Sequence, residues 1–198
     1  MTQRIVLASN NQGKVREIGQ LLADQDMEVL PQSAFHIPEI EETGMSFVEN
    51  AILKARNAAV LSGLPAIADD SGLEVDALKG APGIYSARFA GPDATDADNN
   101  RRMLAELEDV PDEQRTARFQ CLMVYMQHGE DTVPIICQGT WEGRILRTPQ
   151  GENGFGYDPL FFVPEKNCSA AELPAEVKNA MSHRGKALQC LLQALSHG

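Results

Sequence analysis

The sequence contains no long apolar run, which excludes proteins that cross a membrane with an apolar helix. A membrane-spanning helix needs about 20 consecutive, mostly apolar residues, and no stretch approaches that length. The amino terminus also lacks the apolar core of a signal peptide and passes straight into a strand-like pattern. We therefore predict a cytoplasmic protein that has no membrane partner.

Cysteine is scarce and never closely paired in the sequence. The four cysteines lie at positions 121, 137, 168 and 190, without a CxxC pair or a histidine at ligand spacing. Zinc sites and dithiol redox centres usually show such spacing. We expect reduced thiols.

Basic residues are outnumbered by acidic ones. The chain has 17 Lys and Arg against 28 Asp and Glu, and its formal net charge is -11. Proteins that coat nucleic acid rely on a surplus of Lys and Arg, so a nucleic-acid partner is excluded. A small anion can still bind where a few local cations and a metal meet.

No internal repeat or linker divides the 198 residues, of which 43% are hydrophobic and 23% are charged. Such a composition is typical of a folded globular protein, and the length suffices for one substantial core. We predict a single domain over residues 1–198.

Residues 66–72 form the stretch around which the other motifs are organised. A short apolar run leads there into Asp69 and Asp70, followed by Ser71 and a glycine. If this is a strand that ends at the acids, its two adjacent carboxylates point to opposite faces, one toward the chemistry and one toward the scaffold. A carboxylate at the carboxyl end of such a strand can hold Mg²⁺ or activate a water. The alternative is a turn whose side chains cap their own backbone, and residue type alone leaves both open.

A polar loop over residues 9–14 lies between a predicted strand, residues 5–8, and a predicted helix. Apolar residues recur at helical spacing in that helix, at Val15, Ile18, Leu21 and Leu22. Its N-terminus directs backbone N–H groups and the positive dipole end at the loop, which suits phosphate, and Lys14 adds a charge. A plain helix cap is the alternative, because the loop lacks the GxxxxGK[ST] pattern.

A cluster of acids over residues 39–42 precedes a second predicted helix. Ser46 and Glu49 form a capping-box pattern, and the helix runs to Leu61 before Gly63. The acids are by default a solvated loop, and Lys54 is by default a solvated lysine. The role of Lys54 depends on what the helix packs beside.

Two segments near the C-terminal end stand out for residue type. One places Phe155 and Tyr157 among three glycines, which would let a flat ligand approach a ring; a Phe tucked into the core is the alternative. In the other, Ser182 is predicted to cap the last helix, with His183 and Arg184 in its first turn. Since the helix dipole disfavours arginine there, the pattern indicates a nearby anion or base carbonyl; an ordinary surface pair is the alternative.

The remaining elements are predicted from pattern alone. They are strands over residues 28–30, 118–126, 133–145 and 160–163, and a helix capped by Thr95 and Asp98.

In this order the motifs resemble the inosine triphosphate pyrophosphatase family, in particular its bacterial branch, which acts on deoxyinosine, inosine and xanthosine triphosphates. The resemblance covers nearly the whole chain. Seven segments carry it, each modest alone but specific together: residues 9–14, 41–44, 47–55, 68–73, 82–88, 154–159 and 182–185. One departure is Ser9, where relatives often have Thr, and the hydroxyl is kept.

The resemblance implies an α/β fold in which a long curved mixed sheet is flanked by helices, with two lobes around a central cleft. It also implies a homodimer that requires Mg²⁺ and converts the purine nucleoside triphosphates dITP, ITP and XTP to the monophosphate and pyrophosphate. The reaction would remove them from the nucleotide pool before incorporation into DNA or RNA.

The resemblance further implies roles for individual residues. Asp70 would be the catalytic carboxylate and a metal ligand, with Glu42 or its neighbour Glu41 as the second metal ligand. The substrate-binding residues would be Ser9, Asn10, Asn11, Gln12, Gly13, Lys14 and Lys54 for the phosphates, and Ser71, Phe155, Gly156, Tyr157, Asp158, Lys178, His183 and Arg184 for the nucleoside.

The chemistry agrees with these roles. Attack at the α-phosphorus brings a water toward a polyanion, so it needs charge neutralisation and a base. Phe155 could stack on any purine, and selecting a 6-oxo group would then fall to a donor such as Arg184 or a backbone N–H. Two alternatives stay open: a nucleotide-binding regulatory module without turnover, and a related pyrophosphatase acting on pyrimidine or modified nucleotides.

Overall fold

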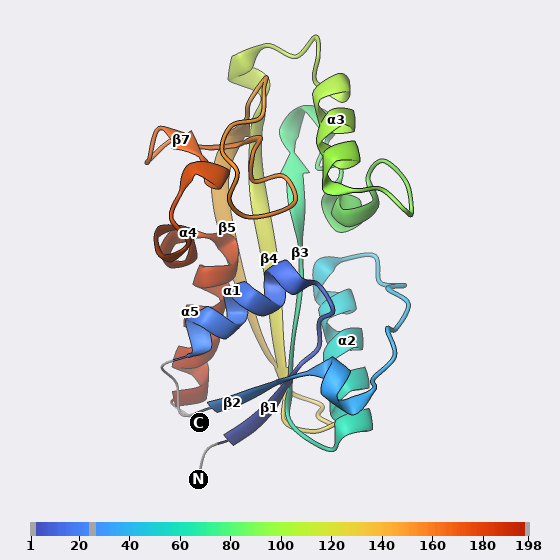
Figure 1. The fold of residues 1–198 in the computed structure, drawn as a ribbon. Helices are drawn as coiled ribbons and strands as arrows, with labels where there is room; N and C mark the ends of the chain where they lie inside the picture. The colour runs from blue at the N-terminus through green and yellow to red at the C-terminus, as the bar shows by residue number, and fades with distance from the viewer. Residues whose placement is uncertain (1–2, 24–26, 197–198) are drawn as a thin grey trace. The chain divides into compact units, whose positions relative to one another are not determined.

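The computed structural model describes residues 3–23 and 27–196, and it contains a seven-stranded sheet in the order β2-β1-β3-β4-β5-β6-β7 (Figure 1). The strands are β1 (Gln3–Leu7), β2 (Met27–Pro31), β3 (Ala66–Val75), β4 (Thr116–Met126), β5 (Ile135–Ile145), β6 (Phe161–Val163) and β7 (Cys168–Ser169). The helices are α1 (Gln12–Leu22), α2 (Phe47–Ser62), α3 (Asp96–Glu106), α4 (Ala175–Met181) and α5 (His183–Ser196). Short 3-10 helices are η1 (Gln32–Phe35), η2 (Asp76–Leu78), η3 (Gly83–Arg88), η4 (Asp112–Gln114) and η5 (Ala170–Glu172).

The sheet is mixed, which confirms the predicted fold class. Strand β1 pairs in parallel with β2 and β3, whereas β6 pairs antiparallel with β5 and β7. Among the described residues, none of the helices combines the length and the apolarity that a bilayer crossing requires.

The chain forms two compact units. Unit 1 comprises Met1–Asp70, Cys121–Gly139 and Arg184–Gly198, and unit 2 comprises Ser71–Gln120 and Thr140–His183. The predicted single domain with two lobes around a cleft stays a prediction.

The strands of unit 1 bury both of their faces. On β1, Ile5 and Leu7 belong to a core cluster with residues of α1 and α5, whereas Val6 belongs to a second cluster with the alanines of α2. Figure 1 shows α2 on one side of these strands and α1 and α5 on the other. Because side chains alternate along a strand, the same rule on β3 directs Asp69 toward α1 and α5 and Asp70 toward α2.

Local capping explains where the helices of unit 1 begin and end. The Asn11 side chain accepts a hydrogen bond from the Lys14 backbone N–H at the start of α1. Ser46 accepts from the Glu49 backbone N–H at the start of α2, and Gly63, with φ 68°, ends that helix in the left-handed region, where glycine is favoured. The predicted start of α2 at Ser46 and its predicted end before Gly63 are confirmed.

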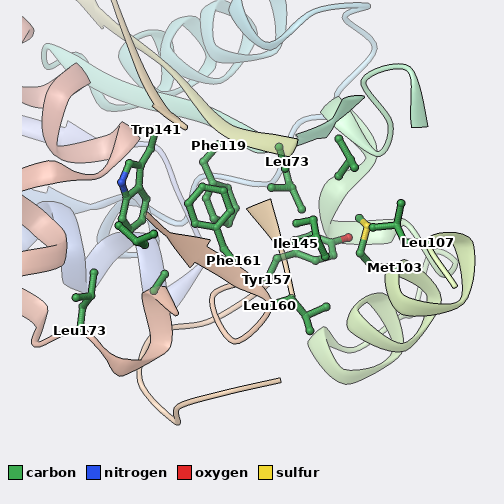
Figure 2. Packing of buried hydrophobic residues seen from close by; sticks show 14 residues of the cluster. Leu73, Met103, Leu107, Phe119, Trp141, Ile145, Tyr157, Leu160, Phe161 and Leu173 are labelled. Atoms are coloured by element: carbon green, nitrogen blue, oxygen red, sulfur yellow. The ribbon is translucent and has the colours of Figure 1, made fainter. Parts of the chain in front are cut away.

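Unit 2 is built on an aromatic core. Figure 2 shows Phe119, Trp141 and Phe161 close together, with Met103 and Leu107 of the α3 segment in the same cluster. The Phe119 and Phe161 ring centroids lie 4.6 Å apart and those of Trp141 and Phe161 lie 5.1 Å apart. Tilted rings at these distances are a favourable aromatic arrangement.

Two sequence-based expectations were incomplete or wrong. Strand β3 does not end at Asp69 and Asp70 but continues to Val75, because both carboxylates bind cations from elsewhere in the chain and leave the strand backbone free to pair. The turn alternative is wrong for the same reason. Helix α4 was not predicted, although Pro174 stands directly before it, a common helix-start signal.

Candidate active site

Asp70 shares a cation with a second carboxylate in unit 1. The Lys54 Nζ donates to Asp70 Oδ1 at 2.8 Å and to Glu42 Oε1 at 2.9 Å. Asn50, one turn before Lys54 on α2, donates from Nδ2 to Asp70 Oδ2 at 3.4 Å. Residues four apart on a helix lie on the same face, so α2 presents both donors to β3.

Burial controls the proton affinity of Asp70. The side chain of Asp70 is 9% exposed. Burial raises the pKa of Asp70, and the Lys54 and Lys14 cations offset this only in part. Burial lowers the pKa of Lys54, but Asp70, Asp69 and Glu42 outweigh it, so that the pKa of Lys54 is raised overall. Asp70 is thus a better proton acceptor than an ordinary aspartate and still lies beside a lysine that stays charged.

Asp69 lies in a separate ionic network on the opposite face of β3. Its side chain is fully buried, and the Lys14 Nζ lies 2.9 Å from Oδ2. The Arg184 Nη2 lies 3.5 Å from the same oxygen, while the Arg184 Nη1 donates to Glu17 Oε2. Burial would raise the pKa of Asp69, but Lys14, Arg184 and Lys54 outweigh it and hold the pKa well below its usual range. Asp69 is therefore a charged scaffold residue that anchors two cations.

The polar loop before α1 is ordered by its own side chains. Asn11 accepts from the Lys14 backbone N–H at 3.1 Å and donates its own backbone N–H to Ser9 Oγ at 3.2 Å. Asn10 donates to Glu39 at 2.8 Å, and Gln12 donates to the Asn10 carbonyl at 3.4 Å. The side chains of Asn10, Asn11 and Gln12 are exposed, whereas Gly13 is buried. An anion can therefore reach exposed donors next to Lys14.

The glycine-rich segment of unit 2 is held by one buried carboxylate. Asp158 Oδ2 accepts from the Phe155 backbone N–H at 2.9 Å and from Lys178 Nζ at 2.5 Å. A Cβ on Gly154, which has φ 78°, would lie 2.0 Å from that same oxygen. Only glycine allows this approach.

The two aromatic residues of this segment have different environments. Tyr157 is buried and donates its hydroxyl to the Ser86 carbonyl at 2.8 Å. Phe155 is half-buried, and the Lys178 ammonium lies 5.2 Å from its ring centroid. Tyr157 is therefore a core residue, whereas Phe155, the residue that the core alternative concerned, is only half-buried and lies beside a cation.

His183 is part of the aromatic core of unit 2. It is 4% exposed, and its ring stacks on Phe119 at 4.7 Å between centroids with an interplanar angle of 13°. Of the other unit 2 residues named from the sequence, Ser71 and Gly156 are half-buried. The Gly156 backbone N–H donates to Asp96 at 2.7 Å.

The structure distinguishes the two neighbouring acids that the sequence left open. Glu41 is exposed, whereas Glu42 is half-buried and bound to Lys54. Sequence reasoning missed Glu17 and Asn50 as site residues. Their only signal was helical spacing, because Glu17 lies three residues after Lys14 on α1 and Asn50 lies four before Lys54 on α2.

Few side chains are available as metal ligands. In the described ranges no cluster of three or more His, Cys, Asp or Glu side chains could hold an ion. Asp70 and Glu42 are two carboxylates that contact the same Lys54 ammonium.

Comparison with known proteins agrees with the resemblance inferred from the motifs. A model of the Ham1 family matches residues 5–194. A dITP/XTP pyrophosphatase of Vibrio cholerae serotype O1 is 60% identical over 193 residues, which cover 98% of this chain and 96% of that protein. A dITP/XTP pyrophosphatase of Escherichia coli O157:H7 is 57% identical over 196 residues, covering 99% of this chain and 100% of that protein. The structure of a HAM1 protein from Coxiella burnetii matches with a TM-score of 0.91 at 51% identity, over 99% of this chain and 100% of that one. The chain belongs to the Ham1 family.

Proposed function

We propose that this protein hydrolyses dITP, ITP and XTP to the monophosphate and pyrophosphate, and so clears them from the nucleotide pool. The observation that carries the proposal is the buried Asp70 carboxylate, which shares the Lys54 ammonium with Glu42, in a chain 60% identical to a protein named dITP/XTP pyrophosphatase. A carboxylate base beside fixed cations is what hydrolysis of a polyanion needs.

We propose Mg²⁺ as the metal, held by Asp70 and Glu42. The residues fit it because one cation, the Lys54 ammonium, already contacts both carboxylates. Mg²⁺ in nucleotide enzymes is commonly bound by one or two carboxylates plus substrate phosphates. When bound, it would neutralise charge on the triphosphate.

The residues of unit 1 account for the phosphate chemistry. Lys14 and the exposed donors of residues 9–14 bind the phosphates, and Lys54 adds a second cation. Asp70 accepts a proton from the water that attacks the α-phosphorus, and pyrophosphate leaves. Asp69 positions Lys14 and is itself bound by Arg184, and neither Asp69 nor Arg184 touches substrate.

The residues of unit 2 account for the choice of base. Phe155 stacks on a purine, which gives affinity without selection. We propose Lys178, which lies beside that ring and binds Asp158, as the donor to a 6-oxo group. Adenine carries a 6-amino group, which is itself a hydrogen-bond donor and would face this donor in place of the 6-oxo acceptor. Such a mismatch costs about 1–3 kcal/mol, roughly tenfold to a hundredfold in selectivity.

We also propose a cytoplasmic homodimer. Exposed apolar side chains on unit 1 support self-association. They are Val60 and Leu61 near the end of α2, Val133 just before β5, and Ile136 near the start of β5.

A panel of triphosphates tests the proposed substrate. With Mg²⁺ present, we expect ITP, dITP and XTP to be hydrolysed with a kcat/KM at least tenfold above that for ATP, because only the 6-oxo bases match the donor. Monophosphate formation is measured by chromatography, with dUTP and dCTP as pyrimidine controls. Binding of ITP without turnover would indicate a regulatory module, and preferential turnover of a pyrimidine would refute the purine assignment.

A further inference from the structure

The Lys54 ammonium occupies the place where the two proposed metal ligands converge. It lies 2.8 Å from Asp70 Oδ1 and 2.9 Å from Glu42 Oε1. The Lys54, Asp70 and Glu42 side chains are 16%, 9% and 28% exposed. Charges this sheltered interact more strongly than ion pairs in bulk water, so the ammonium is a real competitor for any other cation.

Charge counting shows why a metal and the ammonium exclude one another here. The two carboxylates carry two negative charges, and Lys54 carries one positive charge. A divalent metal in place of the ammonium would balance the pair, whereas a metal added beside it would put three positive charges against two negative ones. The phosphates of a nucleotide supply the missing negative charge.

The small number of possible metal ligands also disfavours metal binding in the absence of a nucleotide. The described part of the chain offers no cluster of three or more possible ligand side chains, so a metal bound before substrate would depend on two carboxylates and water. Mg²⁺ gives up its water reluctantly and commonly uses substrate phosphates as ligands. In the described ranges the site therefore offers a metal two carboxylates, and the Lys54 ammonium that already contacts both opposes its binding.

The ammonium can leave while the carboxylates stay. A lysine head group sits on a flexible four-carbon stem, and Asn50 bonds the other oxygen of Asp70 at 3.4 Å, which holds that carboxylate independently of Lys54. We propose that Lys54 acts as an internal substitute for the metal in the nucleotide-free protein, so that metal binds only together with a nucleotide whose phosphates draw the ammonium away. This inference rests on the proposed function.

Metal binding without nucleotide tests the inference. Mn²⁺ is the probe, and free Mn²⁺ is counted by electron paramagnetic resonance as protein is added. We expect the Lys54→Met variant, which keeps the length of the stem without its charge, to bind Mn²⁺ at least tenfold more tightly than the wild type. Equal affinity of the two proteins would overturn the inference.

Matched variants locate the gained site. Added to Lys54→Met, the change Glu42→Gln should abolish the gain, and Glu41→Gln, one residue away and exposed, should retain it. Loss of the gain in the Glu41→Gln background alone would also overturn the inference. If Lys54→Met does not fold, as judged by circular dichroism, Lys54→Gln gives the same comparison with a side chain that can still donate to a carboxylate.

The outcome is independent of the proposed substrate. A tenfold gain in Mn²⁺ affinity together with failure of the triphosphate panel would refute the function and keep the cation competition. Success of the panel without that gain would refute the competition alone.

Discussion

Asp70→Asn is expected to lower kcat by about 10²–10⁴-fold while the nucleotide Kd changes only a few-fold, because the loss falls on the proton acceptor in the transition state. The asparagine keeps the size of the side chain and can still accept from Asn50. The measurement pairs steady-state hydrolysis of ITP with calorimetric binding of ITP to the same variant. A kcat within tenfold of the wild type would refute the role of Asp70.

Asp76→Asn is the matched control for this prediction. Asp76 directly follows β3 and binds Arg118 at 2.8 Å, so the substitution has the same chemistry and leaves the site around Asp70 intact. We expect its kcat to equal that of the wild type. A loss equal to that of Asp70→Asn would show that the effect is not specific to the proposed base.

Asp69→Asn is expected to reduce the free energy of unfolding by about 3–5 kcal/mol at pH 7, the usual result of breaking a buried ionic network from one side. Asp69 is fully buried and anchors both Lys14 and Arg184. The substitution would remove the carboxylate that lies 2.9 Å from Lys14 and would leave Arg184 bound to Glu17. Urea unfolding followed by circular dichroism measures the difference.

The pH dependence of that difference has a definite sign. The pKa of Asp69 is held below its usual range in the folded state, so the stability it contributes is present above the unfolded pKa of about 3.9 and is lost as pH falls toward the folded pKa. The gap between the wild type and Asp69→Asn should stay constant from pH 7 to pH 5 and shrink by about 1.4 kcal/mol per pH unit below about pH 4. Asp93→Asn, at an exposed position, should show almost no gap at any pH. A gap for Asp69→Asn that is unchanged at pH 3 would contradict the ionic account.

Local signals in the sequence predicted where α2 and α3 begin. Ser46 with Glu49, and Thr95 with Asp98, cap α2 and α3 as expected, because a capping box depends only on residues three positions apart. The pattern of apolar residues along the sequence likewise indicated where the long strands lie. These features could be predicted because each is visible among residues close together in the sequence.

The end of β3 could not be predicted in this way. The partners of Asp69 and Asp70 are Lys14, Arg184 and Lys54, which are distant in sequence and meet only in the folded chain. Without them, two acids followed by serine and glycine are typical of a turn.

The roles of individual residues in the candidate site also depend on contacts between residues that are distant in sequence. The order of the motifs was enough to indicate the family, but it could not choose between Glu41 and Glu42, which are the same residue type and differ in burial and in the contact of Glu42 with Lys54. Nor could it show that Arg184 binds Glu17, since the two lie 167 positions apart. Arg184 met the expectation of a nearby anion, and that anion is part of the protein.

Hydrolysis in water enriched in ¹⁸O tests the central claim most directly. If Asp70 activates a water for attack at the α-phosphorus of ITP, mass spectrometry should find one ¹⁸O in the monophosphate and none in the released pyrophosphate. Label in the pyrophosphate, or release of orthophosphate and a diphosphate, would contradict the proposed reaction.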